Sequence, residues 1–222
     1  TIICPNNVTV STDAGLCSAV VSYSAPGTAD NCPGEVASQT AGLGSGATFN
    51  LGVSTESFLV TDASGNTAAC SFTITVNDTE NPAISCPTDT ALSTEAGLCT
   101  ATFSYSTPVG SDNCAGLQTS QTAGLGSGAA FPVGTTTETY LAIDTAGNQV
   151  SCSFNVTVND NEPPVPTCPA DITVSTGTGA CEAIVTYTAP TVADNCPGAS
   201  ISQSAGMGSG ATYGVGMFTE TY

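Results

Sequence analysis

The cysteines of this 222-residue chain recur with a single period of 82 residues. The four positional series are Cys4, Cys86 and Cys168; Cys17, Cys99 and Cys181; Cys32, Cys114 and Cys196; and Cys70 and Cys152. Four series that share one period indicate an internal repeat, and about 80 residues is the size of a small domain. We expect three tandem copies, at residues 1–80, 81–162 and 163–222, the third being truncated before its final strands.

Polar and apolar residues alternate along several short segments, which is typical of half-buried β-strands. In the segment 67–76, Cys70, Phe72 and Ile74 share one face, and an Asp-x-x-Gly-Asn turn at residues 62–66 precedes it. In the segment 17–23, alternate residues from Cys17 to Tyr23 face inward. No segment has helical periodicity, so the sequence predicts an all-β chain of tandem immunoglobulin-like antiparallel β-sandwiches.

The charge balance excludes several classes of partner. The chain has 18 acidic residues and no Lys, Arg or His. Nucleic acid binding and binding to anionic membrane surfaces both need cationic side chains, so neither is expected. A cationic partner is favoured. No apolar run reaches transmembrane length and no signal peptide is recognised, and we expect the sequence to be a window of a longer array.

The density of cysteines indicates an extracellular, secreted or cell-surface protein in which they form disulfides. The four cysteines of one copy allow three pairings. Cys17 and Cys70 lie on inward faces, while Cys4 and the loop of Cys32 are expected at one end of the copy. Zinc is disfavoured because Cys-x-x-Cys pairs are absent. The predicted disulfides are therefore Cys4–Cys32, Cys17–Cys70, Cys86–Cys114, Cys99–Cys152 and Cys168–Cys196.

The order of short motifs in each copy resembles the hyalin repeat, or HYR domain. The motifs are an initial Cys-Pro, a Gly-x-Cys strand, Asp-Asn-Cys after a proline, Gly-x-Gly-Ser-Gly, Asp-x-x-Gly-Asn, and Cys-Ser-Phe followed by an acidic linker ending in proline. Copies 1 and 2 contain all of them, and copy 3 ends before the last two. The resemblance implies an extracellular immunoglobulin-like module of adhesion and matrix proteins without enzymatic activity.

An acidic linker joins each copy to the next and predicts a metal site. The linker carboxylates and the Asp-Asn pair of the following copy are expected at the same joint. Carboxylate and amide oxygens are the ligands that calcium prefers. The alternative is that these residues form turns and solvate the linker, a role we expect for Asp62 and Asp144. The predicted calcium ligands are Asp78, Glu80, Asp112 and Asn113 at the first joint, and Asp160, Glu162, Asp194 and Asn195 at the second.

Three further patterns have simple interpretations. The Gly-Leu-Gly-Ser-Gly segment at residues 42–46 lacks the lysine and helix of a phosphate loop, so we expect a turn or close backbone packing. The strand residues Glu56, Glu138 and Glu220 are expected to face solvent. The glycosylation triplets, all expected to be exposed, begin at Asn7, Asn77 and Asn155.

The sequence thus favours a disulfide-stabilised rod, stalk or fibre with a structural or adhesive role. Without His or Lys, catalysis near neutral pH would need a shifted carboxylate, so no enzyme is expected. Partners would be other repeats of the same or neighbouring chains, or an extracellular protein or glycan. The alternatives are an adhesin that binds a glycan or protein through its loops, and the non-catalytic stalk of a secreted enzyme.

Overall fold

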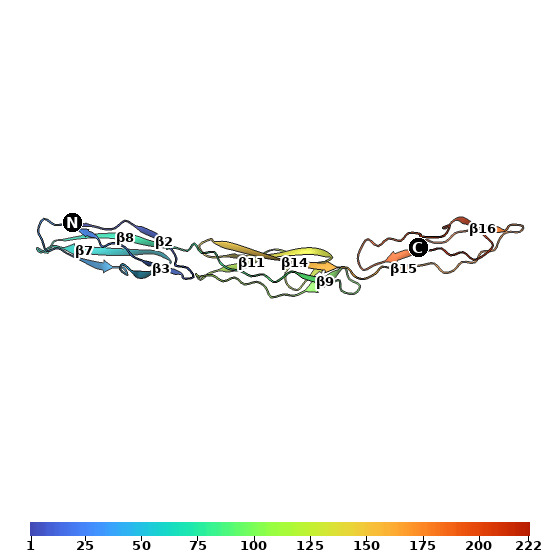
Figure 1. Cartoon of the computed structure of the whole chain (residues 1–222), viewed down its shortest axis with the longest axis horizontal. Helices are drawn as coiled ribbons and strands as arrows, with labels where there is room; N and C mark the ends of the chain where they lie inside the picture. The colour runs from blue at the N-terminus through green and yellow to red at the C-terminus, as the bar shows by residue number, and fades with distance from the viewer. The chain divides into compact units, whose positions relative to one another are not determined.

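The computed structural model describes residues 1–222 and is built from strands without a helix (Figure 1). It therefore contains no helix that could span a membrane. The strands are β1 (Ile2–Ile3), β2 (Val8–Ser11), β3 (Ser18–Val21), β4 (Gly27–Thr28), β5 (Val36–Ala41), β6 (Ala47–Asn50), β7 (Gly52–Thr61), β8 (Thr67–Asn77), β9 (Thr90–Ser93), β10 (Thr100–Phe103), β11 (Gln118–Ala123), β12 (Ala129–Pro132), β13 (Gly134–Ile143), β14 (Gln149–Asn159), β15 (Val165–Thr167), β16 (Glu182–Val185), β17 (Thr191–Ala193) and β18 (Ala211–Gly214).

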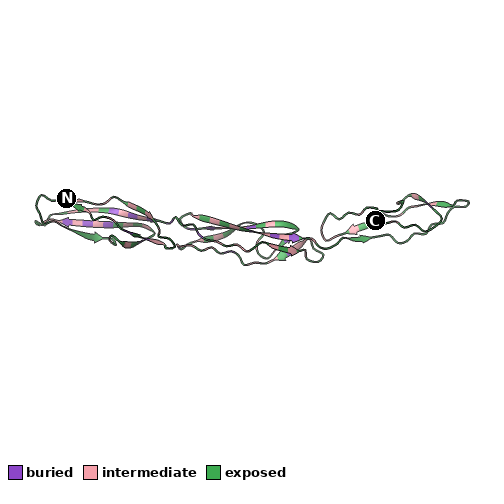
Figure 2. Cartoon of the chain, in the orientation of Figure 1, coloured by how far each residue is buried: buried purple, intermediate pink, exposed green.

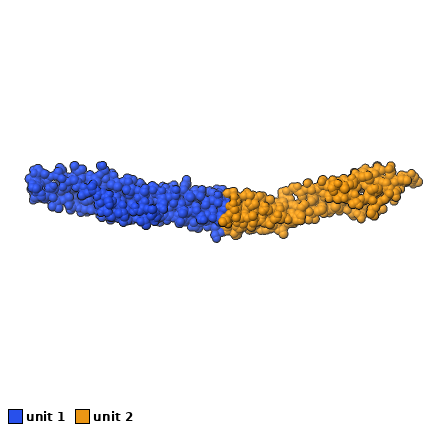
Figure 3. Space-filling view, viewed as in Figure 1, with its two compact units in different colours: residues 1–87, 106–124, 138–154 blue, residues 88–105, 125–137, 155–222 orange.

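The chain divides into two compact units (Figure 3). Unit 1 contains residues 1–87, 106–124 and 138–154, and unit 2 contains residues 88–105, 125–137 and 155–222. The second copy of the repeat is divided between them, so the units and the three copies are different partitions of one chain. The predicted copy boundaries at residues 80 and 162 stay a prediction.

The first copy, within unit 1, contains a four-stranded sheet and two two-stranded sheets. The large sheet has the order β2-β8-β7-β5, and the small ones are β3-β6 and β1-β4. Strands β7 and β8 form an antiparallel hairpin from Gly52–Val76 to Thr61–Thr67. Strand β2 instead runs parallel to β8. The predicted all-β sandwich is confirmed, but it is not purely antiparallel, because β2 pairs in parallel with β8, the last strand of the copy.

Alternation along the strands builds the core of the first copy. Figure 2 shows buried residues at alternate positions in the second half of β7 and of β8. These side chains pack against β3 and β6, and the resulting cluster consists of Ala19, Val21, Phe49, Phe58, Phe72, Ile74 and Val76. Phe49 and Ile74 are fully buried, whereas Val20, of opposite parity, is 59% exposed. The predicted inward faces are therefore confirmed.

The second copy has the same connectivity, and the third has fewer strands. The sheet β11-β13-β14-β9 repeats the large sheet, including its parallel pair of strands. The two-stranded sheet β10-β12 repeats β3-β6. Phe131 and Phe154 are buried in this copy. In the third copy, β15 pairs with β17 and β16 with β18, and Tyr213 is buried.

The prediction that the recurring glutamates face solvent was wrong. Glu56 has the same parity on β7 as Phe58 and is 0% exposed, Glu138 is also 0% exposed, and Glu220 is half-buried. A buried carboxylate without a cation needs hydrogen-bond donors. The Glu56 carboxylate accepts hydrogen bonds from Tyr23 Oη at 2.7 Å and Gln39 Nε2 at 2.8 Å.

Two further donors to Glu56 come from the glycine-rich segment. The backbone N–H groups of Leu43 and Gly44 donate to the carboxylate at 2.9 and 3.0 Å. Gly42 has φ +103°, and a Cβ atom there would overlap the Glu56 carboxylate. The predicted close backbone packing is therefore confirmed. The segment is an anion-binding loop whose anion is a side chain of the same copy.

These contacts also set the ionisation of Glu56. Burial raises the pKa of Glu56, but the hydrogen bonds from Tyr23, Leu43, Gly44 and Gln39 outweigh it and hold the pKa below its usual range. The carboxylate is therefore ionised at neutral pH. Such a group stabilises the folded state above its unfolded pKa of about 4.3, and that contribution is lost as the pH falls through the lower folded value.

We predict that Glu56→Gln lowers the free energy of unfolding by about 1.5–3 kcal/mol at pH 7, since the amide replaces an acceptor by a donor facing other donors. The difference from wild type should shrink below about pH 4, where the unfolded-state carboxyl is protonated. Urea unfolding at both pH values measures it. The control is Glu182→Gln on the exposed face of β16. Equal losses in both variants would contradict the prediction.

Candidate functional site

Two disulfides connect consecutive copies, and two others lie within the first and second copies. Within the copies, Cys4 pairs with Cys70 and Cys86 with Cys152, each pair 66 residues apart. Between the copies, Cys17 pairs with Cys114 and Cys99 with Cys196, each 97 residues apart. The disulfide prediction was wrong for the pairs Cys4–Cys32, Cys17–Cys70, Cys86–Cys114, Cys99–Cys152 and Cys168–Cys196.

The strand arrangement explains these pairings. The segment that starts with β1 packs against β8, which brings Cys4 and Cys70 to a Cα–Cα distance of 5.7 Å. Cys17 lies at the opposite end of the first copy, just before β3, where the linker leaves. The loop containing Cys114 lies at the end of the second copy that faces the first. The Cα atoms of Cys17 and Cys114 are therefore only 4.8 Å apart.

Three cysteines carry exposed free thiols: Cys32, Cys168 and Cys181. Each has counterparts one period away that form disulfides. Cys32 corresponds to Cys114, which is bound to the preceding copy, and Cys181 corresponds to Cys99, which is bound to the following copy. The free thiols therefore occupy positions that elsewhere in the chain form bonds.

Hydrogen bonds reinforce the first joint, which lies entirely within unit 1. The backbone carbonyl of Asp78 in the linker accepts a hydrogen bond of 3.3 Å from Asn148 Nδ2 of the second copy. The Glu80 carboxylate accepts a hydrogen bond of 2.8 Å from the Gly15 N–H. Linker residues therefore contact both copies.

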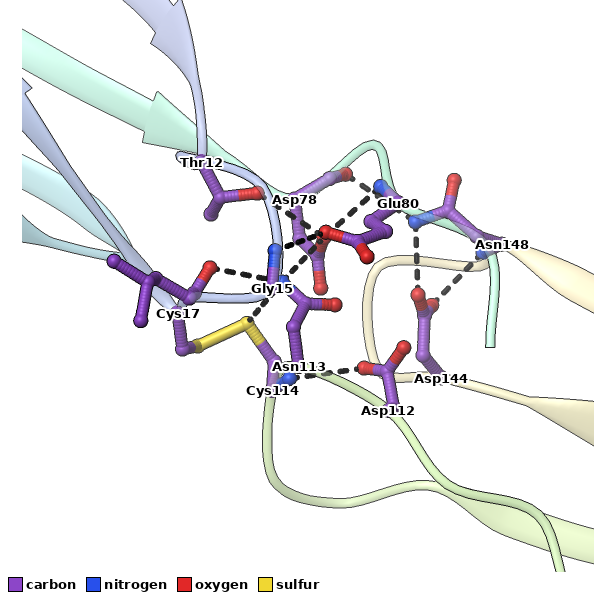
Figure 4. The surroundings of a disulfide bond; sticks show 11 residues. Thr12, Gly15, Cys17, Asp78, Glu80, Asp112, Asn113, Cys114, Asp144 and Asn148 are labelled. Atoms are coloured by element: carbon purple, nitrogen blue, oxygen red, sulfur yellow. Dashed lines mark hydrogen bonds between the residues drawn. A yellow bond between two sulfur atoms is a disulfide. The ribbon is translucent and has the colours of Figure 1, made fainter. Parts of the chain in front are cut away.

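Asn113 connects the disulfide loop to the first copy and to the linker (Figure 4). Its Nδ2 donates to Leu16 O at 3.0 Å and to Asp78 Oδ1 at 3.3 Å. The neighbouring Cys114 N–H donates to Asp112 Oδ2 at 3.1 Å. The loop is thereby held beside the linker.

Three carboxylates meet at this joint. Oxygen atoms of Asp78, Asp112 and Asp144 all lie within 4.8 Å of one another, and the side chains turn toward one another in Figure 4. Asp78 and Asp144 are each only 6% exposed. Two unit charges at this separation repel by about 3–4 kcal/mol at an effective dielectric constant of 20. The chain has no cationic side chain to offset that repulsion.

Three buried side-chain oxygen atoms at this joint lack hydrogen-bond donors. Asp78 Oδ1 accepts from Thr12 Oγ1, the Glu80 N–H and Asn113 Nδ2. In contrast, Asp78 Oδ2, Asp112 Oδ1 and Asn113 Oδ1 are buried without a partner. Buried oxygens are normally hydrogen-bonded, so these three need an explanation.

Asp144 both forms a turn, as the sequence predicted, and belongs to the carboxylate cluster, which the sequence did not predict. Its carboxylate accepts from the Asn148 N–H and side-chain amide, both at 2.8 Å, so the predicted turn is confirmed, as it is for Asp62 with Asn66. Burial raises the pKa of Asp144, but the hydrogen bonds from Asn148, Gly147 and Ala146 hold the pKa below its usual range. Its place in the carboxylate cluster was missed.

The structure brings together three of the four predicted ligands of the first joint. Asp78, Asp112 and Asn113 converge, but Glu80 binds the Gly15 N–H and is not part of the cluster. The second joint, within unit 2, repeats this pattern for Asp160, Asp194 and Asn195, while Glu162 binds the Gly97 N–H.

The three glycosylation triplets differ in accessibility. Asn7 and Asn77 are exposed, as predicted. Asn155 is half-buried, and its side-chain N–H donates to Asp89 at 3.3 Å, so the prediction that it is exposed was wrong. Their use as glycosylation sites stays a prediction.

Comparison with protein families identifies the repeat. The HYR domain model matches residues 1–76, 77–158 and 159–222, which confirms the resemblance found in the sequence. Hyalin from Strongylocentrotus purpuratus is 37% identical over 199 residues, which are 87% of this chain and 16% of that protein. Hyalin from Lytechinus variegatus is 35% identical over 151 residues, which are 66% of this chain and 28% of that protein.

Other similarities cover less or are weaker. A Sushi, von Willebrand factor type A, EGF and pentraxin domain-containing protein 1 from Rattus norvegicus is 38% identical over 46% of this chain and 3% of its own length. Among solved structures, the Protocadherin Gamma B2 extracellular cadherin domains 3–6 align with a TM-score of 0.36 at 14% identity, covering 72% of this chain and 52% of that one. The chain thus spans less than a third of the curated relatives it matches.

We predict that peptide mapping without reduction finds Cys17 linked to Cys114 and Cys99 linked to Cys196. Cleavage must use chymotrypsin with a glutamate-specific protease, because the chain has no Lys or Arg. Reduction should separate both linked pairs. A peptide that links Cys17 to Cys70 would show that the joints are not covalently bridged.

Proposed function

Because the chain belongs to the HYR domain family along its whole length, we propose that it is an extracellular, adhesion-type repeat protein whose role is structural. The observation that carries the proposal is the disulfide between consecutive copies. We infer that the repeats form a stiff rod, stalk or fibre in which each joint transmits force. The secreted character is supported by the four disulfides, since such bonds persist outside the cell.

The stiffness follows from two covalent connections at each joint. Without the disulfide, one short linker would join the first two copies, and rotation about its backbone bonds would change their angle. The Cys17–Cys114 bond adds a second connection beside that linker. Together with the hydrogen bonds from Asn113 to Leu16 and Asp78, it restricts bending and twisting.

The interior of the first copy also supports a structural, force-bearing role. The Cys4–Cys70 bond joins the first segment of the copy to its last strand, β8, which stabilises the copy by about 4 kcal/mol on the chain-entropy model. The Glu56 contacts fix the glycine-rich loop against the core. A domain restrained in this way extends little under load.

A non-catalytic role is supported by how the buried carboxylates are used. Glu56 is fully buried and engaged by four donors, so it is not available to a substrate. We propose as partners other repeats of the same or neighbouring chains and extracellular proteins. The matched hyalins are much longer than this chain, so partners of the whole protein are part of the proposal.

We predict that the double variant Cys17→Ser, Cys114→Ser keeps its folded repeats but broadens the distribution of distances between labels in the first and second copies. Small-angle scattering and double electron–electron resonance measure this change. The matched control is Cys4→Ser, Cys70→Ser, which removes a bond within one copy and should lower thermal stability without broadening that distribution. An unchanged distribution in the first variant would contradict the proposal.

A further inference from the structure

We propose that Asp78, Asp112 and Asp144, with the side-chain oxygen of Asn113, bind one calcium ion at the first joint. This site is independent of the adhesion-type role proposed above, because it rests on the local arrangement of these four side chains. Two observations carry it. Three carboxylates converge within 4.8 Å, and three buried oxygens among these residues have no hydrogen-bond donor.

The chemistry of the donors selects a hard cation. All four side chains offer oxygen, which calcium and magnesium prefer. Zinc and copper prefer nitrogen or sulfur ligands, but the chain has no histidine and the nearby Cys114 sulfur is in a disulfide. A divalent cation would also offset the repulsion among the three carboxylates.

The number and kind of ligands favour calcium over magnesium. Calcium accepts six to eight oxygens in flexible geometry, including several carboxylates and amide oxygens. Magnesium needs near-ideal octahedral geometry, keeps several waters and is usually bound through only one or two carboxylates. Three carboxylates together with an unpartnered amide oxygen therefore match the pattern of a calcium site.

Access for further ligands is provided by an open cavity of about 400 Å³ beside the cluster. Asp78, Thr145 and Ala146 line it. Calcium takes six to eight oxygens, and the four side chains supply the first of them. Water entering through this cavity can supply the rest.

The second joint offers an internal comparison. Asp160, Asp194 and Asn195 repeat the first three ligands, and Asn195 Oδ1 is likewise buried without a partner. The counterpart of Asp144 would be residue 226, which is not in the 222-residue chain. Because ligand charge tunes calcium affinity, the second joint of this chain should bind calcium at least tenfold more weakly than the first.

Calorimetric titration of the oxidised 222-residue chain with calcium tests the site. We expect one tighter and one weaker site per chain, and magnesium binding at least tenfold weaker than calcium at the tighter one. Asp144→Asn should weaken the tighter site about tenfold or more. Asp62→Asn is the matched control, because Asp62 makes the same turn contacts, with Asn66, but is not part of the carboxylate cluster.

A second readout uses the disulfide next to the site. Asn113 contacts both Asp78 and the Cys114 sulfur, so bound calcium should slow the reduction of Cys17–Cys114 by dithiothreitol. Reduction of Cys4–Cys70, at the other end of the copy, should not change. Absence of calcium binding, equal affinity for magnesium, or equal losses in the Asp144 and Asp62 variants would overturn the proposal. An unprotected Cys17–Cys114 bond in the calcium-loaded chain would also overturn it.

Discussion

Consecutive copies of this repeat are joined by a disulfide as well as by the backbone, and the arrangement of the joint depends on that second bond. Cys17–Cys114 holds the loop of Asp112 and Asn113 beside the linker residue Asp78. The three carboxylates of the joint repel one another, and no cationic side chain offsets them. A covalent bond resists this repulsion, which hydrogen bonds worth about 1 kcal/mol each would oppose only weakly.

The absence of Lys and Arg leaves the chain two ways to accommodate buried negative charge. Inside each copy, neutral donors converge on a carboxylate, as Tyr23, Gln39 and two backbone N–H groups do on Glu56. At the joint, the buried Oδ2 atom of Asp78 has no such donor. The same composition therefore produces a satisfied anion in the core and an unsatisfied group of anions between copies.

Strand parity was sufficient to predict the core but not the cysteine pairs. Alternation placed Phe72 and Ile74 correctly, and the same parity on β7 places Glu56 beside Phe58, although its charge suggested the surface. Pairing failed for a different reason. In a periodic sequence, each copy offers a cysteine at the same repeat position. Cys32 in the first copy and Cys114 in the second are such a pair, and Cys17 is bonded to Cys114. The period alone does not identify which copy supplies the partner, and the contact between copies decides it.

The bond between copies also changes what a single break in the backbone can do. A protease that nicks the acidic linker between Asp78 and Ala83 leaves residue 17 on one fragment and residue 114 on the other, still joined through sulfur. A cut in the second linker leaves Cys99 and Cys196 joined in the same way. Separating two consecutive copies therefore requires both hydrolysis of the linker peptide bond and reduction of the disulfide. These two reactions rarely coincide outside the cell.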